Sequence, residues 1–250
     1  MSELSNYIDE YLKTEYTLKS TLKDSVQSSV YLYQKNDSAK QIVKISQKNR
    51  NDHVLRRLRG QLNKNTATIY EVCSNDEDVT VLEEYISGAT LRHIVEANGG
   101  TLKRELAVKY ALDICNGLVF IHSLGIIHRD IKPSNIIITE QGEAVIIDFG
   151  IARLTDDSKY ADTKNLGTAG YAAPEQFGIY QSGPVTDIYA VGVLLNELLL
   201  GVHPTIDTPK GKLGKVINKC IMAQMSKRYQ NVSELSLIHI SEPTRLLSIS

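Results

Sequence analysis

The sequence has no tryptophan, only three phenylalanines and three cysteines, and no glycine before Gly60. The cysteines, Cys73, Cys115 and Cys220, are scattered and lack C-x-x-C spacing, which argues against a disulfide framework and against a cysteine zinc site. They indicate a reducing cytoplasm in which the thiols are small buried hydrophobes. Neither sign of charge dominates, since 28 Lys and Arg stand against 29 Asp and Glu. This balance argues against a nucleic-acid or membrane-surface partner held by bulk charge.

Long hydrophobic runs are also missing. The longest, residues 190–202, contains Asn196 and Glu197, whereas a membrane span needs about 20 apolar residues. It predicts a buried helix. The segment after Met1 lacks the basic and apolar regions of a signal peptide. A chain of 250 residues with 42% hydrophobic residues is expected to be globular, with one large domain or two small ones.

The two halves of the chain differ in their hydrophobic pattern. Between about residues 15 and 86, short β-rich runs occur, with one short amphipathic helix inside residues 51–62. The runs are residues 29–33, 41–45, 67–73 and 79–86. After Gly88 the pattern becomes mostly helical, with long periodic stretches at 102–124 and 187–200. This order predicts an α+β chain with two lobes and a cleft between them.

Three motifs follow one another in the second half. They are His-Arg-Asp-Ile-Lys-Pro-Ser-Asn at 128–135, Asp-Phe-Gly at 148–150, and Gly-Thr-Ala-Gly-Tyr-Ala-Ala-Pro-Glu at 167–175. Over roughly residues 15–234 this set resembles the protein kinase signature of H-R-D, D-F-G and A-P-E. The resemblance implies a small β-rich N-lobe, a larger helical C-lobe, and transfer of a phosphoryl group from ATP with Mg²⁺ in the cleft. The phrasing of the motifs is similar to that of bacterial eukaryotic-like Ser/Thr kinases.

The resemblance assigns the chemistry to specific residues. Asp130 would orient the attacking hydroxyl, and Lys132 would reach the γ-phosphate; a Lys at this place is typical of Ser/Thr-directed kinases. Asn135 and Asp148 would hold Mg²⁺, which prefers oxygen ligands. Thr168 would tie the substrate-binding loop to the catalytic loop. The alternative for Asp130, Asn135 and Asp148 is capping and turn chemistry.

Structural roles follow from the same resemblance. Glu175 is expected to pair with Arg228 in a partly buried ion pair. Asp187 is expected to hold the backbone of the catalytic loop. His128 and Phe149 are expected to be packing residues and not catalysts.

The nucleotide-binding part departs from the family pattern. Alignment on Val30 puts Lys23, Ser25 and Ser28 at the positions where kinases carry three glycines. Glycine allows the backbone to approach the phosphates closely and to adopt positive φ. We therefore expect a weaker or differently posed ATP clamp.

The strand lysine of kinases is predicted to be Lys44, after Ile42 and Val43; the alternative is an exposed strand lysine. In kinases this lysine pairs with a glutamate from a helix. The corresponding position in this sequence falls near Leu55, so the usual ion pair is absent or rebuilt. One hypothesis is that Glu83, at the gatekeeper position, supplies the counter-charge for Lys44, because a buried unpaired carboxylate is costly. The alternative is a slipped register with Glu83 facing solvent.

The remaining assignments concern adenine and regulation. Backbone groups of Glu84 and Ile86 are expected to hold the adenine edge, and Ile137 to line the nucleotide site with Val30. In the loop after the D-F-G motif, Thr163 is predicted as a phosphorylation site that pairs with the arginine before Asp130. The alternative is a solvated polar loop.

The predicted organisation is an N-terminal extension (1–14), an N-lobe (15–86), a C-lobe with a truncated last helix (87–234) and a non-native tail (235–250). Residues 235–245 resemble a translated sequencing-library adapter; the alternative is a genuine short amphipathic end. A native continuation beyond residue 234 would have to supply any membrane attachment.

The sequence therefore predicts an ATP- and Mg²⁺-dependent Ser/Thr protein kinase that acts on protein substrates in the cytoplasm and not on nucleic acid. The alternative is a pseudokinase or ATP-binding scaffold, which the missing glycines favour. A kinase of small molecules is disfavoured by residues 167–175, which resemble a protein-substrate docking segment. The oligomeric state is left open.

Overall fold

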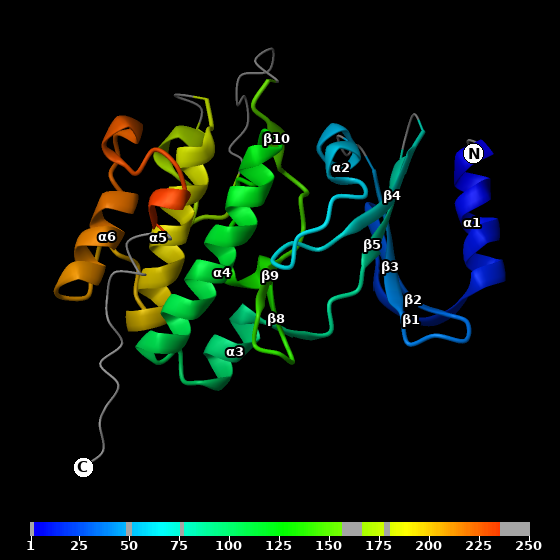
Figure 1. Ribbon diagram of the computed structural model, residues 1–250, viewed down its shortest axis with the longest axis horizontal. Coiled ribbons are helices and arrows are strands. Elements are labelled where there is room, and N and C mark those ends of the chain that lie inside the picture. The colour runs from blue at the N-terminus through cyan, green and yellow to red at the C-terminus, as the bar shows by residue number, and fades with distance from the viewer. Residues whose placement is uncertain (1–2, 49–51, 76–77, 157–166, 178–180, 236–250) are drawn as a thin grey trace.

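The computed structural model describes residues 3–48, 52–75, 78–156, 167–177 and 181–235. A β-sheet with flanking helices forms the N-terminal part, and a mostly helical part follows it (Figure 1). The predicted α+β chain with a β-rich N-terminal and a helical C-terminal part is confirmed.

An antiparallel five-stranded sheet forms the N-terminal part, in the spatial order β1-β2-β3-β5-β4. Its strands are β1 Tyr16–Asp24, β2 Ser28–Lys35, β3 Gln41–Lys48, β4 Ile69–Ser74 and β5 Asp78–Glu84. The four predicted β-rich runs fall on β2 to β5. Strand β1 lacked a clear signal in the sequence because all its residues after Tyr16 are exposed and show no alternation.

Two helices cover opposite faces of this sheet (Figure 1). Helix α2 (His53–Leu58) is shorter than the predicted helix, because the chain turns at Gly60, whose φ of 73° lies in the left-handed region. Helix α1 (Glu3–Glu15) was predicted only as an extension, yet it folds onto the sheet. Its signal was a pair of apolar residues four positions apart, Ile8 and Leu12, which are both 2% exposed.

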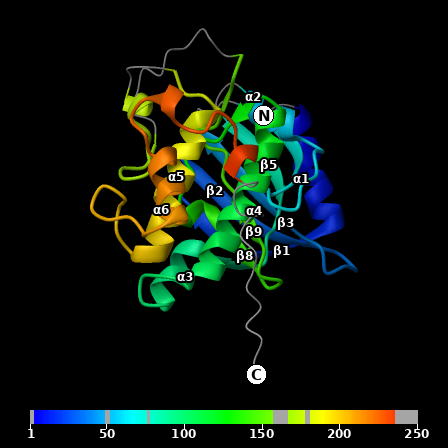
Figure 2. The same cartoon turned by 60° about the vertical axis from the view of Figure 1, so that its left-hand side comes forward.

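Alternation along the strands decides which side chains meet which helix. Ile42 of β3 and Leu82 of β5 pack against Ile8 of α1. Val81 of β5 and Ile45 of β3 belong with α2 and the C-terminal part. The sheet therefore has an α1 face, turned away from the C-terminal part, and an opposite face turned toward it, which we call the cleft face after the cleft that the sequence predicts (Figure 1, and turned by 60° in Figure 2).

Four helices dominate the C-terminal part: α3 Leu91–Ala97, α4 Arg104–Ser123, α5 Pro184–Leu200 and α6 Lys212–Cys220. Five short strands also belong to this part of the chain. They are β6 Gly88–Thr90, β7 Ile126–Ile127, β8 Ile136–Thr139, β9 Ala144–Ile146 and β10 Arg153–Leu154. Three 3-10 turns complete it: η1 Pro133–Asn135, η2 Pro174–Phe177 and η3 Met225–Lys227. Helices α4 and α5 match the predicted periodic stretches.

Helix α5 is the buried helix that the apolar run predicted. Pro184 begins it, where a missing N–H costs nothing, and Gly201 ends it with a φ of 68°. Gly192 lets α6 approach closely, since a Cβ there would lie 2.5 Å from the Cβ of Cys220. Within the described residues, no helix combines the length and the apolar character needed to cross a membrane. Leu235, the first residue of the tail predicted to be non-native, is 4% exposed and belongs to the core.

Candidate active site

Three polar side chains surround Asp130, which lies in the loop between β7 and β8. Lys132 Nζ lies 2.7 Å from Asp130 Oδ2, and Asn135 donates to the same oxygen at 2.9 Å. Thr168 donates its hydroxyl to Asp130 Oδ1 at 2.7 Å and accepts a bond from Lys132 at 2.7 Å. Three of the predicted residues lie close together in the sequence, and the fold brings Thr168 to them from a distant loop.

The environment of Asp130 keeps its carboxyl group ionised. Burial by itself would raise the pKa of this carboxyl, but hydrogen bonds from Lys132, Thr168 and Asn135 and the charge of Lys132 hold the pKa below its ordinary value. Asp130 is therefore a negatively charged hydrogen-bond acceptor at neutral pH.

Asp187 of α5 fixes the start of this loop from beneath. Its carboxylate is fully buried and accepts the backbone N–H of His128 at 2.9 Å and of Arg129 at 2.8 Å. Arg129 has a φ of 69°, an unusual value for a residue other than glycine, and these bonds help to hold it there. His122 Nε2 lies 2.8 Å from the same carboxylate. The sequence predicted the role of Asp187 but did not single out His122, whose position on α4 becomes relevant only in the fold.

A buried ion pair supports the segment after Thr168. Arg228 donates to both carboxylate oxygens of Glu175, at 2.7 and 2.8 Å, and neither residue is more than 2% exposed. Thr186, next to Asp187, donates to Glu175 at 2.9 Å. The structure thus brings Glu175 and Arg228 into the contact that the resemblance implied.

Asp148 and Phe149 lie at the other side of the loop. The ring of Phe149 packs edge-on against that of His128, with centroids 5.2 Å apart. Asp148 has a φ of 64°, and its Oδ1 accepts the backbone N–H of Gly150 at 2.9 Å. This turn holds the Asp148 carboxylate beside the catalytic loop, where its charge acts on His128.

The donor chemistry here suits a hard divalent cation. Asn135 uses its Nδ2 for Asp130, which leaves the amide oxygen Oδ1 as the atom that can ligate a cation. Asp148 adds carboxylate oxygens, and Mg²⁺ prefers such oxygen ligands together with water and phosphate. Among the described residues, no cluster of three or more His, Cys, Asp or Glu side chains forms a metal site built from protein alone. The residues therefore fit a cation shared with a phosphate ligand.

The loop where kinases carry glycines is a tight hairpin closed by serine. Ser25 donates its hydroxyl to the carbonyl of Ser28 at 2.9 Å, and its Oγ accepts the backbone N–H of Ser28 at 3.1 Å. The backbone N–H of Ser25 donates to the same carbonyl at 3.0 Å. The serine side chain thus closes the turn without glycine.

The structure contradicts the prediction that Lys44 takes the place of the nucleotide-binding strand lysine of kinases. Lys44 Nζ forms an ion pair with Asp9 of α1 at 2.5 Å. Since Ile42 lies on the α1 face, Lys44, two residues further, lies on that face as well. Ile45 lies on the cleft face instead. The sequence signal was misleading because a one-residue shift in a strand moves every side chain to the opposite face.

The proposed pair of Glu83 with Lys44 is also wrong. Glu83 stands directly opposite Val43 in the β3–β5 ladder, so Glu83 and Val43 share the cleft face and Lys44 does not. The prediction that Glu83 points into the protein agrees with its 8% exposure. The counter-charge of Lys44 is Asp9, which could not be found from motifs because it precedes them.

Four further residues were predicted for the nucleotide site: Val30, Glu84, Ile86 and Ile137. Val30 of β2 stands opposite Ile45 and so lies on the cleft face. The backbone N–H of Glu84 donates to the carbonyl of Thr68 at 2.9 Å. Ile86 follows in the connection to β6, and Ile137 is half-buried on β8. Their contacts with adenine stay predictions, and Thr163 lies outside the described residues.

Comparison with known proteins identifies the family of the chain. A family model described as a protein kinase domain matches residues 14–247. A probable serine/threonine-protein kinase of Clostridium perfringens is 35% identical over 162 residues, which is 62% of this chain and 24% of that protein. One of Clostridium acetobutylicum is 34% identical over 200 residues, which is 69% of this chain and 30% of that protein.

A third relative, the serine/threonine-protein kinase PknB of Mycolicibacterium smegmatis, is 33% identical over 190 residues, or 65% of this chain and 30% of that protein. The matched region thus spans less than a third of the length of these relatives. The resemblance to Ser/Thr kinases that the motifs indicated is confirmed by the family model and by the names of these relatives.

Proposed function

The chain belongs to the protein kinase family, and we propose that it transfers the γ-phosphoryl group of ATP to serine or threonine hydroxyls of proteins. The observation that carries the proposal is the cluster of Asp130, Lys132, Asn135 and Thr168, whose side chains are linked by hydrogen bonds of 2.7–2.9 Å. Phosphoryl transfer requires positioning and neutralisation of charge more than covalent participation by the protein.

Each member of the cluster has a separate task. Asp130 accepts a hydrogen bond from the substrate hydroxyl and turns its oxygen toward phosphorus. Its depressed pKa keeps it charged, so it orients the hydroxyl and takes the proton as the bond to phosphorus forms. Lys132 offsets the charge of the γ-phosphate, and Thr168 holds both side chains in place.

We assign the Mg²⁺ ligands to Asn135 and Asp148. When bound, Mg²⁺ would neutralise phosphate oxygens and keep the phosphates in one orientation. The bond from Asn135 to Asp130 links the orientation of the amide oxygen to that of the orienting carboxylate. The Gly150 N–H fixes Asp148 in the same way.

We assign the cation on the sheet side of the cleft to Lys23. Lys23 stands directly opposite Val30, which in turn stands opposite Ile45. Residues directly opposite in antiparallel strands share a face, so Lys23 belongs to the cleft face. It is exposed and lies where β1 enters the hairpin, so its ammonium group can reach a phosphate. This is the role that the resemblance gave to Lys44.

Protein substrates are supported by the segment of residues 167–175, which Gln176 attaches to the catalytic loop through the Arg129 carbonyl at 2.9 Å. The cytoplasm is supported by the cysteines, since all three are free and buried.

The test is transfer of ³²P from ATP to dephosphorylated casein by the purified chain. We expect Asp130→Asn to lower the rate by about 10²- to 10⁴-fold, while the exposed control Asp207→Asn leaves it unchanged. Binding of MgATP by Asp130→Asn is measured in parallel. Equal background transfer by wild type and Asp130→Asn, with MgATP binding retained, would overturn the proposal in favour of an ATP-binding scaffold.

A further inference from the structure

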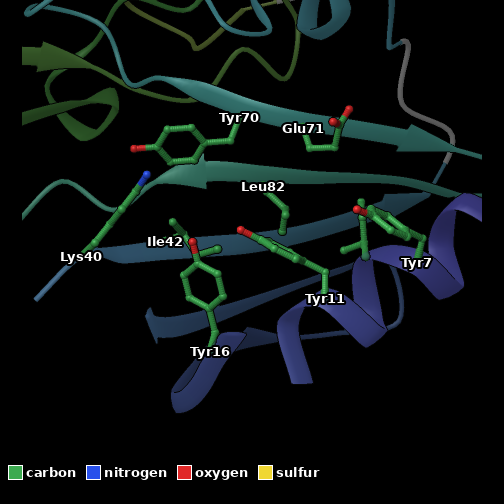
Figure 3. Close-up of a pocket in the computed structure, with 9 residues that line it drawn as sticks. Tyr7, Tyr11, Tyr16, Lys40, Ile42, Tyr70, Glu71 and Leu82 are labelled. Atoms are coloured by element: carbon green, nitrogen blue, oxygen red, sulfur yellow. The ribbon is translucent and has the colours of Figure 1, made fainter. Parts of the chain in front are cut away.

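A cavity of about 380 Å³ lies between α1 and the sheet, on the α1 face (Figure 3). None of the residues assigned to phosphoryl transfer lines it. Small-molecule sites in proteins commonly have volumes of about 300–1,000 Å³. The cavity is therefore large enough for a small ligand and separate from the cleft.

The helix that forms one wall is firmly attached to the sheet. Ile8 and Leu12 are almost completely buried, and burial of such apolar side chains stabilises the contact of the helix with the sheet. The ion pair between Asp9 and Lys44 adds a polar attachment next to this apolar contact. The cavity thus lies within a packed interface between the helix and the strands.

Tyrosine rings form most of the surface that a ligand would meet. Of the 13 tyrosines in the chain, four line the cavity: Tyr7, Tyr11, Tyr16 and Tyr70. The rings of Tyr11 and Tyr16 lie with centroids 5.7 Å apart, and Figure 3 shows both hydroxyl groups near Ile42. Burial, together with a hydrogen bond to Tyr11, raises the pKa of Tyr16 to about 12, so its hydroxyl remains a donor. These rings suit a flat, apolar ligand with an acceptor group.

Two charged residues line the cavity, Glu71 and Lys40, and they differ in whether another residue compensates their charge. Glu71 is compensated, because Arg59 donates to it at 2.7 Å and the Val72 N–H at 3.0 Å. Lys40 forms no ion pair with any part of the chain that the structure describes, and its Nζ lies 4.2 Å from the centroid of the Tyr70 ring. In Figure 3, Lys40 and Glu71 lie at opposite ends of the cavity. An uncompensated cation at one end favours an anionic group on the ligand.

We propose that this cavity binds a small planar aromatic carboxylate, with its ring among the tyrosines and its carboxylate on Lys40. The floor of the cavity is formed by Ile42 and Leu82, whose neighbours Val43 and Glu83 lie on the cleft face. A ligand would therefore contact the strands of the cleft from behind. The proposal does not depend on phosphoryl transfer, because it concerns binding alone.

The experiment titrates the full chain with 2-naphthoate and follows the tyrosine ring signals by NMR. The neutral 2-naphthamide serves as the matched probe that lacks the charge. We expect saturable binding of the carboxylate, with shifts in the signals of Tyr11, Tyr16 and Tyr70, and at least tenfold weaker binding of the amide. Lys40→Met should weaken naphthoate binding about tenfold and leave amide binding unchanged.

Two control variants separate specific binding from other causes. Lys48→Met removes an exposed cation at the far end of β3, the strand that begins directly after Lys40, and outside the cavity, and should not change the affinity. Ile42→Phe fills the cavity and should abolish binding of both probes. If the Ile42→Phe variant does not fold, Lys40→Met remains the decisive variant. No saturable binding at millimolar naphthoate, equal affinity for the amide, or shifts confined to other tyrosines would each overturn the proposal.

Discussion

The two walls of the cleft differ in how their charges are fixed. On the C-terminal wall, Asp130 is bound by three side chains, and the loop that carries it is held by buried Asp187. On the sheet wall, the strand lysine points to the other face, and a serine-closed hairpin stands where kinases carry glycines. The residues proposed for phosphoryl transfer thus lie together, whereas the lysine expected to bind the nucleotide lies on the α1 face. We therefore expect the two walls to respond differently to substitution.

The largest effect is expected from the buried pair on the C-terminal wall. Arg228→Met leaves the Glu175 carboxylate buried without its partner, which should lower the free energy of unfolding by about 3–5 kcal/mol. Arg92→Met is the matched control, because Arg92 is exposed and its guanidinium nitrogen lies as far as 4.0 Å from the carboxylate oxygen of Glu96. It should change the free energy by less than about 1 kcal/mol. Urea denaturation measures the free energy of unfolding of both variants. Equal losses in the two variants would contradict a stabilising role for the buried pair of Arg228 and Glu175.

On the sheet wall, we expect one substitution to strengthen the binding of MgATP. Ile45→Lys places an ammonium group on the cleft face, where it can approach a phosphate, and should lower the Kd for MgATP about tenfold, or about 1.4 kcal/mol. Ile45→Met, which changes the side chain without adding a charge, should leave the Kd unchanged. Calorimetric titration of MgATP compares the two, and unchanged binding by the lysine variant would mean that position 45 does not face the nucleotide.

The buried His128 predicts a pH dependence of stability. Burial lowers its pKa, although the carboxylates of Asp187, Asp148 and Asp130 oppose this shift. Below the ordinary pKa of about 6.5, the unfolded chain takes up a proton that the folded chain does not, so stability falls as the pH is lowered toward the folded pKa. The slope from this group is at most about 1.4 kcal/mol per pH unit.

His128→Phe should remove this contribution. Unfolding measured between pH 7 and 5 should show a shallower decline for the variant than for wild type. Parallel declines would show that His128 is charged in the folded chain.

The smallest effects are expected from substitutions of Lys23 and Lys44, which test which of the two lysines contacts ATP. Lys23→Ala should raise the KM for ATP about threefold, since it removes an exposed cation from the cleft face, worth well under about 1 kcal/mol. Lys44→Met should leave this KM within about twofold of wild type and lower the thermal stability slightly, because its partner is Asp9. The reverse ranking would restore Lys44 as the phosphate-binding residue.

The catalytic wall could be predicted because its residues lie in short motifs with fixed spacing. Asp130, Lys132 and Asn135 are within six residues, and the local turn brings them together. The sheet wall could not be predicted in the same way. The strand around Lys44 was located correctly, but its register was not, because the alternation Ile42-Val43-Lys44-Ile45 fits either face until the partners are known. The cavity beside α1 gave no motif, since its tyrosines come from separate elements.

The sequence by itself determined the family, the order of sheet and helices, and the residues of the catalytic loop, because these depend on local spacing and composition. The tertiary structure alone decided which face of the sheet Lys44 occupies, that Asp9 is its partner, and that α1 encloses a cavity with Lys40 at its end. These features depend on contacts between residues distant in the chain. In such contacts, burial and pairing of charge select one arrangement among several that the local pattern allows.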